Sequence, residues 1–447
     1  MIDLNGKKVL IAGLGKSGLA AGRLLLSVGA SLTVTEINDT PVLRDIAGEL
    51  TAGGAYVELG RHTESLVRGQ DLIVISPGID PRHCIVGWAR RYGIDIISEL
   101  ELGSWFLNCP LICVTGTNGK STVTCLIAHI FQQAGYQAVA GGNLGIPLSE
   151  IAGSKSRIDI AVVEASSFQL RYTKYFKPDI SVWLNFSRDH LDYHQTVDKY
   201  RKAKLRIFQN QTAGEKAVIY FREADKVKEI KPEKVFFGGK DNPIPAVVNQ
   251  GPWENTNLEN MEAAAAVAGL YGISEKVIVQ GIASFRPLPH RNQYIITING
   301  VDFVDDSKAT NVNAVRYALE GCLRPVTLIL GGRDKGGDFR NLKDKVRDKV
   351  KNIIVMGESG DEIAGQLRGA APIYKSTEIQ SAVVLAQELA GPEDIVLLSP
   401  GCSSFDMFSG YEERGRKFQE AVGQLPGVRS KKIISGTKDQ SRQQVSV

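Results

Sequence analysis

The segment Thr-Gly-Thr-Asn-Gly-Lys-Ser-Thr at residues 115–122 constrains the fold more than any other part of the chain. It follows an apolar run at 111–115, typical of a buried strand, and leads into a helical pattern at 121–134 that Gly135 ends. A glycine-rich loop between a strand and a helix presents backbone N–H groups and a helix N-terminus to phosphate. The segment therefore predicts a phosphate-binding loop, in which Lys120 neutralises the β- and γ-phosphates and the Ser121 hydroxyl binds Mg²⁺.

This loop departs from the common nucleotide-binding pattern at one position. Val114 stands where a glycine is usual, six positions before Lys120. A plain glycine-rich turn is the alternative interpretation. The order of strand, loop, lysine–serine pair and helix favours phosphate binding.

Short apolar strands alternate with helices along the chain, which predicts an α/β fold with parallel sheets covered on both faces. Strands are expected at residues 8–12, 31–36, 71–76, 111–115, 158–164, 179–185, 300–304, 326–330, 352–357 and 394–399, and helices also at 198–209 and 261–270. Two prolines in the stretch 285–291 mark a boundary. We expect a Rossmann-like domain at 1–100, a central P-loop ATPase-like domain at 101–287, a second Rossmann-like domain at 288–429, and a disordered polar tail at 430–447.

The first block contains a competing nucleotide signature. Gly13-Leu14-Gly15-Lys16-Ser17-Gly18 follows a strand, and Glu36 ends the next one, as in dinucleotide-binding folds. An NAD-linked oxidoreductase would use this pattern, and so would a site for another nucleoside diphosphate. The later phosphate loop argues against a simple dehydrogenase. The turn Ser76-Pro77-Gly78 ends a third strand, where ligand contact is possible.

Polar residues follow two strands of the second block. Glu164 ends the strand at 158–164, where an acid can hold Mg²⁺ in phosphoryl transfer. The loop 185–194 contains acids and imidazoles suited to a metal or phosphate environment, although ordinary surface polarity explains it equally well. We expect His194 to be a surface residue.

Three polar loops follow strands of the third block, at residues 305–311, 331–337 and 399–404. Open α/β sheets bind ligands at this edge. Lys308, Lys335, Ser403 and Ser404 could receive a small dianion there, whereas ordinary loop chemistry is the alternative.

Composition excludes several functional classes. The net charge is only +4 over 447 residues, without a basic cluster, so nucleic-acid binding is not indicated. The six cysteines fit neither a zinc site nor a disulfide framework. We expect no signal peptide and no membrane helix, and therefore a cytoplasmic protein, which we expect to be a monomer. A nucleotide-regulated binding protein without ligase activity remains a further alternative.

These segments together resemble the Mur ligase family over about residues 1–425. The resemblance rests on TGTNGKST at 115–122, VVEASSFQL at 162–170, DHLDYH at 189–194 and YRKAK at 200–204. LPHR at 288–291, DDSKATN at 305–311 and SPGCSSFDMFSGYEERG at 399–415 are similar to the members that add D-glutamate. The resemblance implies an ATP-dependent ligase that joins D-glutamate to UDP-N-acetylmuramoyl-L-alanine through an acyl phosphate, in peptidoglycan precursor synthesis, with ATP and two Mg²⁺ ions.

The resemblance also implies roles for individual residues. The catalytic residues would be Lys120, Glu164, His190 and Lys204, and the metal ligands Ser121, Glu164, His190 and a carbamylated Lys204. ATP would contact Thr115, Gly116, Thr117, Asn118, Gly119, Lys120, Ser121, Thr122, Val123, Asn257, Asn260, His290, Arg291 and Asp306. The UDP substrate would contact Gly15, Lys16, Ser17, Gly18, Glu36, Ser76, Gly78 and Asn143. D-Glutamate would contact Lys308, Thr310, Lys335, Ser404 and Tyr411. Thr256 departs from the family, which often has a histidine there.

Overall fold

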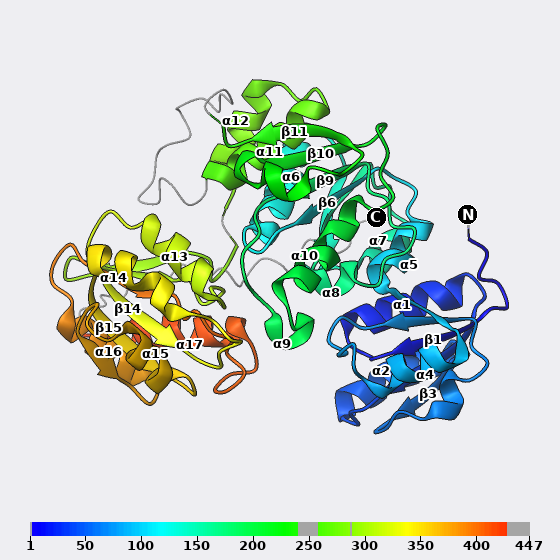
Figure 1. The fold of residues 1–447 in the computed structure, drawn as a ribbon, viewed down its shortest axis with the longest axis horizontal. Helices are drawn as coiled ribbons and strands as arrows, with labels where there is room; N and C mark the ends of the chain where they lie inside the picture. Colours follow the sequence, from blue (N-terminus) through cyan, green and yellow to red (C-terminus); the bar gives the residue numbers. More distant parts are fainter. Residues whose placement is uncertain (1, 240–257, 287, 427–447) are drawn as a thin grey trace. The chain divides into compact units, whose positions relative to one another are not determined.

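The computed structural model describes residues 2–239, 258–286 and 288–426, and these form two compact units (Figure 1). The first unit contains residues up to 186, 193–239 and 259–285. The second contains 187–192, 258, 286 and 288–426. The predicted tail lies outside the described residues, as do Thr256 and Asn257.

The first unit begins with a five-stranded parallel sheet in the order β3-β2-β1-β4-β5. Its strands are β1 (Lys8–Ala12), β2 (Ser31–Glu36), β3 (Tyr56–Leu59), β4 (Leu72–Ile75) and β5 (Asp95–Ser98). Its helices are α1 (Lys16–Ser27), α2 (Pro41–Ala52), α3 (Glu64–Val67), α4 (Cys84–Tyr92) and α5 (Glu99–Phe106). The chain leaves the centre of this sheet in opposite directions from β1 and β4, so the Gly13–Gly18 turn and Ser76 meet at a topological switch point, where such sheets bind ligands.

The same unit contains a six-stranded parallel sheet in the order β11-β10-β9-β6-β8-β7. Its strands are β6 (Leu111–Thr115), β7 (Ala138–Gly142), β8 (Ile160–Glu164), β9 (Ile180–Trp183), β10 (Lys216–Tyr220) and β11 (Glu233–Phe237). Its helices are α6 (Lys120–Gln133), α7 (Leu148–Ala152), α8 (Ser167–Leu170), α10 (Val197–Leu205), η1 (Arg206–Phe208), η2 (Phe221–Val227), α11 (Leu258–Leu270) and α12 (Glu275–Ser284), and α9 (Leu191–His194) crosses between the units. Because β6 lies between β9 and β8, the loops after these three strands share one edge.

The second unit has a six-stranded sheet in the order β12-β13-β17-β14-β15-β16. Its strands are β12 (Gln293–Ile298), β13 (Val301–Asp305), β14 (Val326–Gly331), β15 (Val350–Met356), β16 (Ile373–Lys375) and β17 (Ile395–Leu398). Its helices are α13 (Val312–Glu320), η4 (Phe339–Leu342), α14 (Lys343–Lys349), α15 (Gly360–Leu367), α16 (Ile379–Leu389) and α17 (Tyr411–Gly423). Only β12 pairs in the antiparallel sense among the described strands of this sheet.

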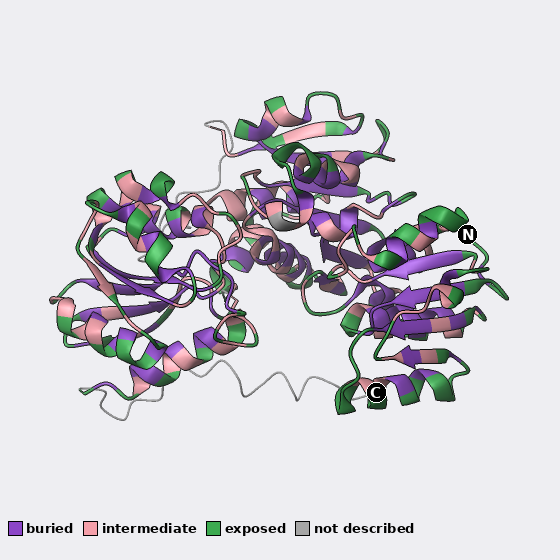
Figure 2. Cartoon of the chain, turned by 60° about the horizontal axis from the view of Figure 1, so that its bottom comes forward, coloured by how far each residue is buried: buried purple, intermediate pink, exposed green. Residues whose placement is uncertain are grey.

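The predicted α/β architecture with three parallel-sheet domains is confirmed. The central strands are mostly apolar because helices cover both faces of each sheet, and they are the most deeply buried elements (Figure 2). The helix predicted at 121–134 is α6, but the one predicted at 198–209 ends earlier as α10 and continues as the 3-10 turn η1.

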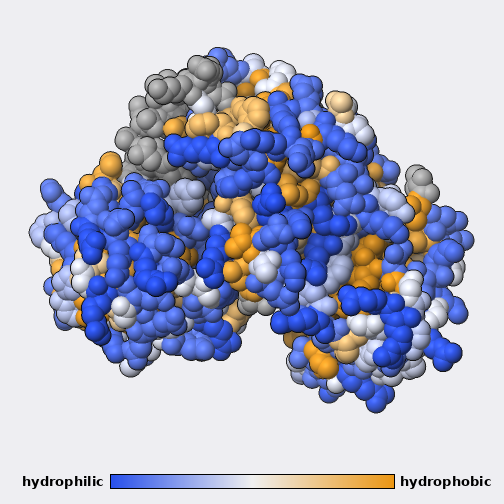
Figure 3. Space-filling view, in the orientation of Figure 1, coloured by the Kyte–Doolittle hydropathy of each residue, from blue (hydrophilic) through white to orange (hydrophobic). Residues whose placement is uncertain are grey.

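Within the described residues no helix is long and apolar enough to cross a membrane, and the face in Figure 3 is mostly hydrophilic.

A buried carboxylate joins the first sheet to the second. Glu101 of α5 has no exposed surface. One of its oxygens accepts from the Trp105 indole at 2.8 Å and the Tyr175 N–H at 2.7 Å, and the other accepts from the N–H groups of Lys174 at 2.8 Å and Phe176 at 2.9 Å. Four donors compensate for the lost hydration of this charge, so the contact holds the two sheets in one unit.

Glu99, two residues earlier, is also buried but has fewer donors. One of its oxygens accepts the Ser149 N–H at 2.6 Å, near the start of α7. The other has no hydrogen-bond partner among the described residues. Burial raises the pKa of Glu99 from 4.5 to about 7.

Replacing Glu101 with glutamine should destabilise the first unit by about 2–4 kcal/mol, because an amide N–H₂ would face N–H donors in a dry site. Urea unfolding measures this change. Glu49→Gln, which removes only an exposed ion pair with Arg23, is the control and should cost less than about 0.5 kcal/mol. Equal effects of the two substitutions would contradict the role of Glu101.

Glu99→Gln should alter how stability depends on pH. The folded state keeps the Glu99 proton up to about pH 7, whereas the unfolded chain loses it above about 4.5, so this group lowers the free energy of unfolding as pH rises through that window. The variant lacks this contribution and should gain stability relative to the wild type between these two pH values. Thermal or urea unfolding across the window tests this, and a difference between the two proteins that is independent of pH would refute it.

Candidate active site

The backbone of the loop between β6 and α6 is held by the end of the neighbouring strand β9. The Asn185 carbonyl accepts the Thr117 N–H at 2.9 Å. Its side chain accepts the Asn118 N–H at 2.8 Å and donates to the Asn118 carbonyl at 3.2 Å. The sequence predicted no individual role for Asn185. The only available signal was that Asn185 ends a predicted strand. Its role depends on β9 lying next to β6, and the sequence alone does not show that these strands are neighbours.

Two glycines of this loop have no room for a side chain. Gly119 has φ +84°, and a Cβ there would lie 2.4 Å from the Asn260 side-chain oxygen. A Cβ on Gly116 would lie 2.9 Å from the Leu184 Cβ. Asn260, predicted to contact ATP, therefore lies directly against the loop. Its predicted companion Asn257 lies outside the described residues.

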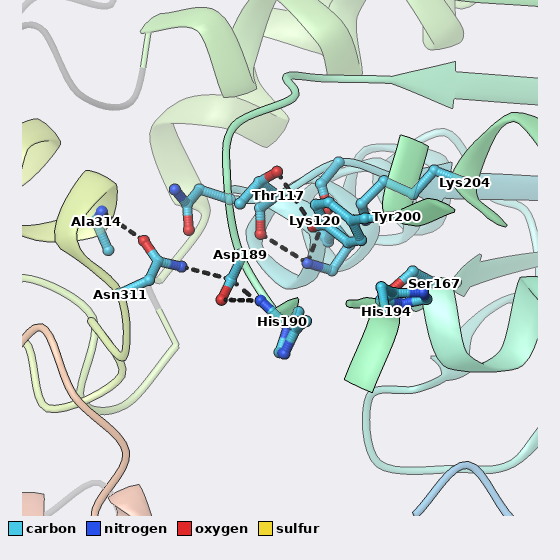
Figure 4. A network of polar contacts seen from close by, with 12 residues as sticks. Thr117, Lys120, Ser167, Asp189, His190, His194, Tyr200, Lys204, Asn311 and Ala314 are labelled. Atoms are coloured by element: carbon cyan, nitrogen blue, oxygen red, sulfur yellow. Dashed lines mark hydrogen bonds and ion pairs between the residues drawn. The ribbon is translucent and has the colours of Figure 1, made fainter. Parts of the chain in front are cut away.

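Lys120 begins α6, and its ammonium folds back over the loop. It donates to the Gly116 carbonyl at 3.1 Å and the Thr117 carbonyl at 2.9 Å (Figure 4). These carbonyls hold a cation beside the helix N-terminus, where a phosphate group would also be attracted. Of the other predicted loop residues, Thr115 donates to the Ala165 carbonyl at 2.9 Å, Val123 donates its N–H to Gly119 at 3.0 Å, and Thr122 is half-buried in the first turn of α6.

The Glu164 carboxylate connects the ends of three neighbouring strands. It accepts the Ser121 hydroxyl at 2.5 Å on one oxygen and the Asn143 amide at 2.8 Å on the other. Glu164 is 3% exposed. Asn143 was predicted to contact the UDP substrate, and in the structure its side-chain amide donates a hydrogen bond to Glu164.

Ser121 and Glu164 supply two hard oxygen ligands side by side, beside a loop suited to phosphate. Mg²⁺ commonly uses one or two such protein ligands together with substrate phosphates and waters, so these residues fit the ion. Among the described residues there is no cluster of three or more His, Cys, Asp or Glu side chains that could hold a metal.

Lys204 of α10 reaches the same loop from another side. It is 1% exposed, donates to the Gly116 carbonyl at 2.6 Å, and lies 5.0 Å from the Tyr200 ring centroid (Figure 4). The Tyr200 hydroxyl is 3.3 Å from the Thr117 hydroxyl. Carbamylation of Lys204 stays a prediction.

His190 belongs to the second unit and has a left-handed backbone with φ 53°. The Asp189 carboxylate accepts the His190 N–H at 2.8 Å on one oxygen and the Asn311 amide at 2.9 Å on the other (Figure 4). The His190 ring nitrogen Nε2 is 3.5 Å from that second oxygen. Asp189 therefore connects the predicted metal ligand His190 to the 305–311 loop.

The prediction that His194 is a surface residue is wrong. It has no exposed surface, and its Nε2 lies 2.9 Å from the Ser167 hydroxyl. Its ring stacks on Phe168 at 5.6 Å between centroids. The polar residues around it in the sequence hid an aromatic cluster that combines the nearby Tyr193 and Tyr200 with Phe168 from a separate segment.

In the first sheet, hydrogen bonds within the protein already hold the turn at Gly13–Gly18. One Glu36 oxygen accepts the Leu14 N–H at 2.9 Å, and the other accepts both the N–H and the side-chain amide of Asn38 at 2.9 Å. A Cβ on Gly18 would lie 2.1 Å from the Gly13 carbonyl, so this glycine allows close helix–strand packing. Both Glu36 oxygens serve the fold, which weakens the dinucleotide interpretation. Gly15, Lys16 and Gly78 are exposed, Ser17 is half-buried, and Ser76 donates to the Gly13 carbonyl at 3.1 Å.

In the second unit, His290 has φ 61°, and its Nδ1 lies 2.7 Å from the Asp305 carboxylate. The adjacent Asp306 accepts the Ser399 hydroxyl at 2.9 Å and the Asn292 N–H at 3.2 Å. Burial raises the pKa of Asp306 from 3.8 to about 7, and the charge of Arg291 opposes this rise. The predicted ATP contacts His290, Arg291 and Asp306 thus form one cluster.

The predicted D-glutamate residues lie on loops of the same unit. Lys308 lies 3.7 Å from the Tyr411 ring centroid, a close cation–π contact. Thr310 and Lys335 line a shared cleft, which Arg188 also lines. Arg188 was not among the predicted residues, because its separation from Lys335 in the sequence concealed their proximity. Ser404 is buried, and its carbonyl accepts the N–H groups of Met407 and Phe408.

Models of protein families match three successive parts of the chain. Residues 7–98 match the Mur ligase MurD-like N-terminal domain, 114–268 the Mur ligase middle domain, and 290–402 the glutamate ligase domain of Mur ligases. The three matches coincide with the three sheets.

Relatives match over almost the whole chain. A UDP-N-acetylmuramoylalanine–D-glutamate ligase of Salinibacter ruber is 38% identical and aligns with 95% of this chain and 99% of its own. The enzyme of that name from Desulfatibacillum aliphaticivorans is also 38% identical, over 95% of this chain and 100% of its own.

Solved structures share the fold at lower identity. The MurF ligase from Thermotoga maritima has a TM-score of 0.62 at 18% identity, over 94% of this chain and 99% of its own. A pseudomurein peptide ligase from Methanothermus fervidus has a TM-score of 0.57 at 19% identity, over 93% of this chain and 99% of its own. The chain belongs to the Mur ligase family.

Proposed function

We propose that this protein is an ATP-dependent ligase that adds D-glutamate to UDP-N-acetylmuramoyl-L-alanine in peptidoglycan precursor synthesis. The observation that carries the proposal is the phosphate loop with Ser121, Glu164 and Asn143 converging at its edge. The relatives of the D-glutamate-adding type, 36–38% identical over about 95% of the chain, supply the substrates.

The γ-phosphate of ATP would occupy the loop between β6 and α6. Lys120 would exchange its loop carbonyls for phosphate oxygens, and the fixed N–H groups at the start of α6 would stabilise charge without reorganisation. Asn260 would meet the adenosine side, together with His290, Arg291 and Asp306 from the second unit. Ser121 and Glu164 would hold one Mg²⁺, and Glu164, His190 and a carbamylated Lys204 would help hold a second. The ions supply positive charge beside the transferring phosphoryl group.

The reaction proceeds in two steps. A carboxylate oxygen of the L-alanine residue attacks the γ-phosphorus, a P–O bond forms, and the bond to ADP breaks. The neutral amine of D-glutamate then attacks the acyl carbon, forms the C–N bond, and expels phosphate, which takes up the proton that the nitrogen loses. The residues contribute mainly by positioning these groups and neutralising charge.

The two other substrates would be held by separate parts of the chain. The rim of the first sheet, with Gly15–Gly18, Glu36, Ser76 and Gly78, would receive the uridine diphosphate, and Asn143 would contact the muramoyl end. Lys308, Thr310, Lys335, Ser404 and Tyr411 would surround D-glutamate. Two lysines on these loops suit a dicarboxylate better than a neutral amino acid.

We further propose that the protein acts as a monomer in the cytoplasm, with neither nucleic acid nor a membrane as partner. All six cysteines lie in the described part of the chain and are free thiols there, which fits a reducing compartment.

Phosphate release with ATP and UDP-N-acetylmuramoyl-L-alanine, measured against a panel of D- and L-amino acids, tests the proposal. D-Glutamate should stimulate release far more than L-glutamate, D-aspartate or L-alanine. Slow hydrolysis that ignores the amino acid would instead support a nucleotide-regulated binding protein, and stimulation by L-alanine would assign the chain a different substrate.

Lys120→Ala should lower kcat by about a hundredfold or more, because the ammonium neutralises charge that grows in the transition state. The muramoyl substrate should still raise the melting temperature of the variant, since its main site is on the first sheet. Lys16→Ala, an exposed lysine on the rim of that sheet, is the comparison and should weaken substrate binding with little change in kcat. Near-normal turnover by Lys120→Ala would remove the phosphate loop from the mechanism.

A further inference from the structure

Arg414 is a buried, positively charged residue of a helix, and its side chain is surrounded mainly by loops. It lies in the first turns of α17 and is 1% exposed. Among the described residues no carboxylate lies within ion-pair distance of its guanidinium. A charge in this position needs other polar partners, because burial without them is costly.

The guanidinium obtains these partners from three loops. Its Nε donates to the Ser307 hydroxyl at 3.0 Å, and Nη2 donates to the Ser307 carbonyl at 2.7 Å. Nη1 and Nη2 both donate to the Cys402 carbonyl at 3.1 Å, and Nη1 also reaches the Gly331 carbonyl at 3.5 Å. One planar group therefore binds the loops that follow β13, β17 and β14, which are adjacent strands of the sheet.

Each contacted position adjoins a residue proposed to bind D-glutamate. Ser307 directly precedes Lys308, Cys402 lies two residues before Ser404, and Gly331 begins the loop that carries Lys335. The Ser307 hydroxyl also donates to the Tyr411 carbonyl at 2.9 Å. The Arg414 side chain therefore contacts all three of the segments that carry the proposed D-glutamate ligands.

We propose that Arg414 is a positioning residue for amino-acid binding, whose guanidinium sets the spacing of the three loops that hold D-glutamate. The identity of the bound amino acid rests on the function proposed above, whereas the coupling of the loops does not.

Lysine cannot reproduce this arrangement. Arginine carries five N–H donors in a fixed plane, and the contacts here use three different nitrogens. An ammonium is a single point with three donors, so it cannot span carbonyls of separate loops. Burial lowers the pKa of Arg414 to about 10, which still leaves the group charged at neutral pH.

The attachment of α17 to the sheet does not depend on Arg414 alone. Phe418, Ala421 and Val422 of the same helix are buried in the apolar cluster that includes strand and α16 residues. Substitution of Arg414 should therefore release the loops while the helix stays docked.

The test compares Arg414→Lys with Val383→Ala, a buried substitution on α16 in that apolar cluster. Val383 is fully buried and lies outside the three loops, so Val383→Ala lowers global stability without removing any Arg414 contact, and urea unfolding of both variants measures how far their stability losses correspond. Both purified full-length proteins are assayed for phosphate release with varied D-glutamate, and for amide hydrogen exchange at residues 307–311, 331–337 and 402–405.

Arg414→Lys should raise the KM for D-glutamate by about tenfold or more and leave the KM for UDP-N-acetylmuramoyl-L-alanine within about twofold. Exchange should quicken in all three loops together, and Val383→Ala should show neither effect. A KM for D-glutamate within about twofold of the wild type, or an equal rise in Val383→Ala, overturns the proposal. Wild-type protein that ignores D-glutamate would refute the proposed function alone, because the exchange comparison still decides whether Arg414 couples the loops.

Discussion

The contact of the Glu164 carboxylate with Ser121 and Asn143 is the interaction on which the central site depends. Three strands deliver these residues, since Ser121 follows β6, Glu164 ends β8 and Asn143 follows β7, and all three strands are neighbours. A buried carboxylate is costly unless hydrogen-bond donors surround it. Glu164 therefore requires the loop and the strand ends to place the Ser121 and Asn143 donors correctly. The Ser121 hydroxyl oxygen and the Glu164 carboxylate, which are hydrogen-bonded to each other in the protein, are suited to share a cation when phosphate binds.

All three sheets bring their candidate ligand-binding loops together in the same way. Parallel strands end at a common edge, and crossover helices return the chain to the opposite edge, so loops far apart in sequence gather in one place. The first sheet gathers Gly13–Gly18 and Ser76, the second gathers the loops after β6, β8 and β9, and the third gathers those after β13, β14 and β17. In the proposed function, such an arrangement would hold the three substrates on separate sheets and leave the transfer chemistry to the central loop.

Local sequence predicted what depends on local periodicity and turn chemistry. The apolar strands, the loop at 115–122 and Glu164 at a strand end were all readable, because strand, glycine loop and helix follow each other directly. His194 was misassigned, since its burial depends on Phe168, which the fold brings from α8, as well as on Tyr200 of the following helix α10. The sequence also predicted no role for three other residues, Asn185, Arg188 and Arg414. Their partners lie on neighbouring strands or loops, and the order of strands in a sheet cannot be predicted from one segment of sequence. The antiparallel edge strand β12 was not predicted although its signal is local, because Asn299 and Gly300, both with positive φ, form a two-residue hairpin turn between β12 and β13.

The central claim is that the terminal phosphoryl group of ATP passes to a carboxylate before the amide bond forms. Oxygen-18 placed in the alanine carboxylate of the muramoyl substrate follows this step directly. If an acyl phosphate forms, one labelled oxygen leaves with the phosphate, and mass spectrometry of the released phosphate should find one label for each amide bond made. Unlabelled phosphate, formed together with the amide product, would show that ATP is cleaved without activating the carboxylate.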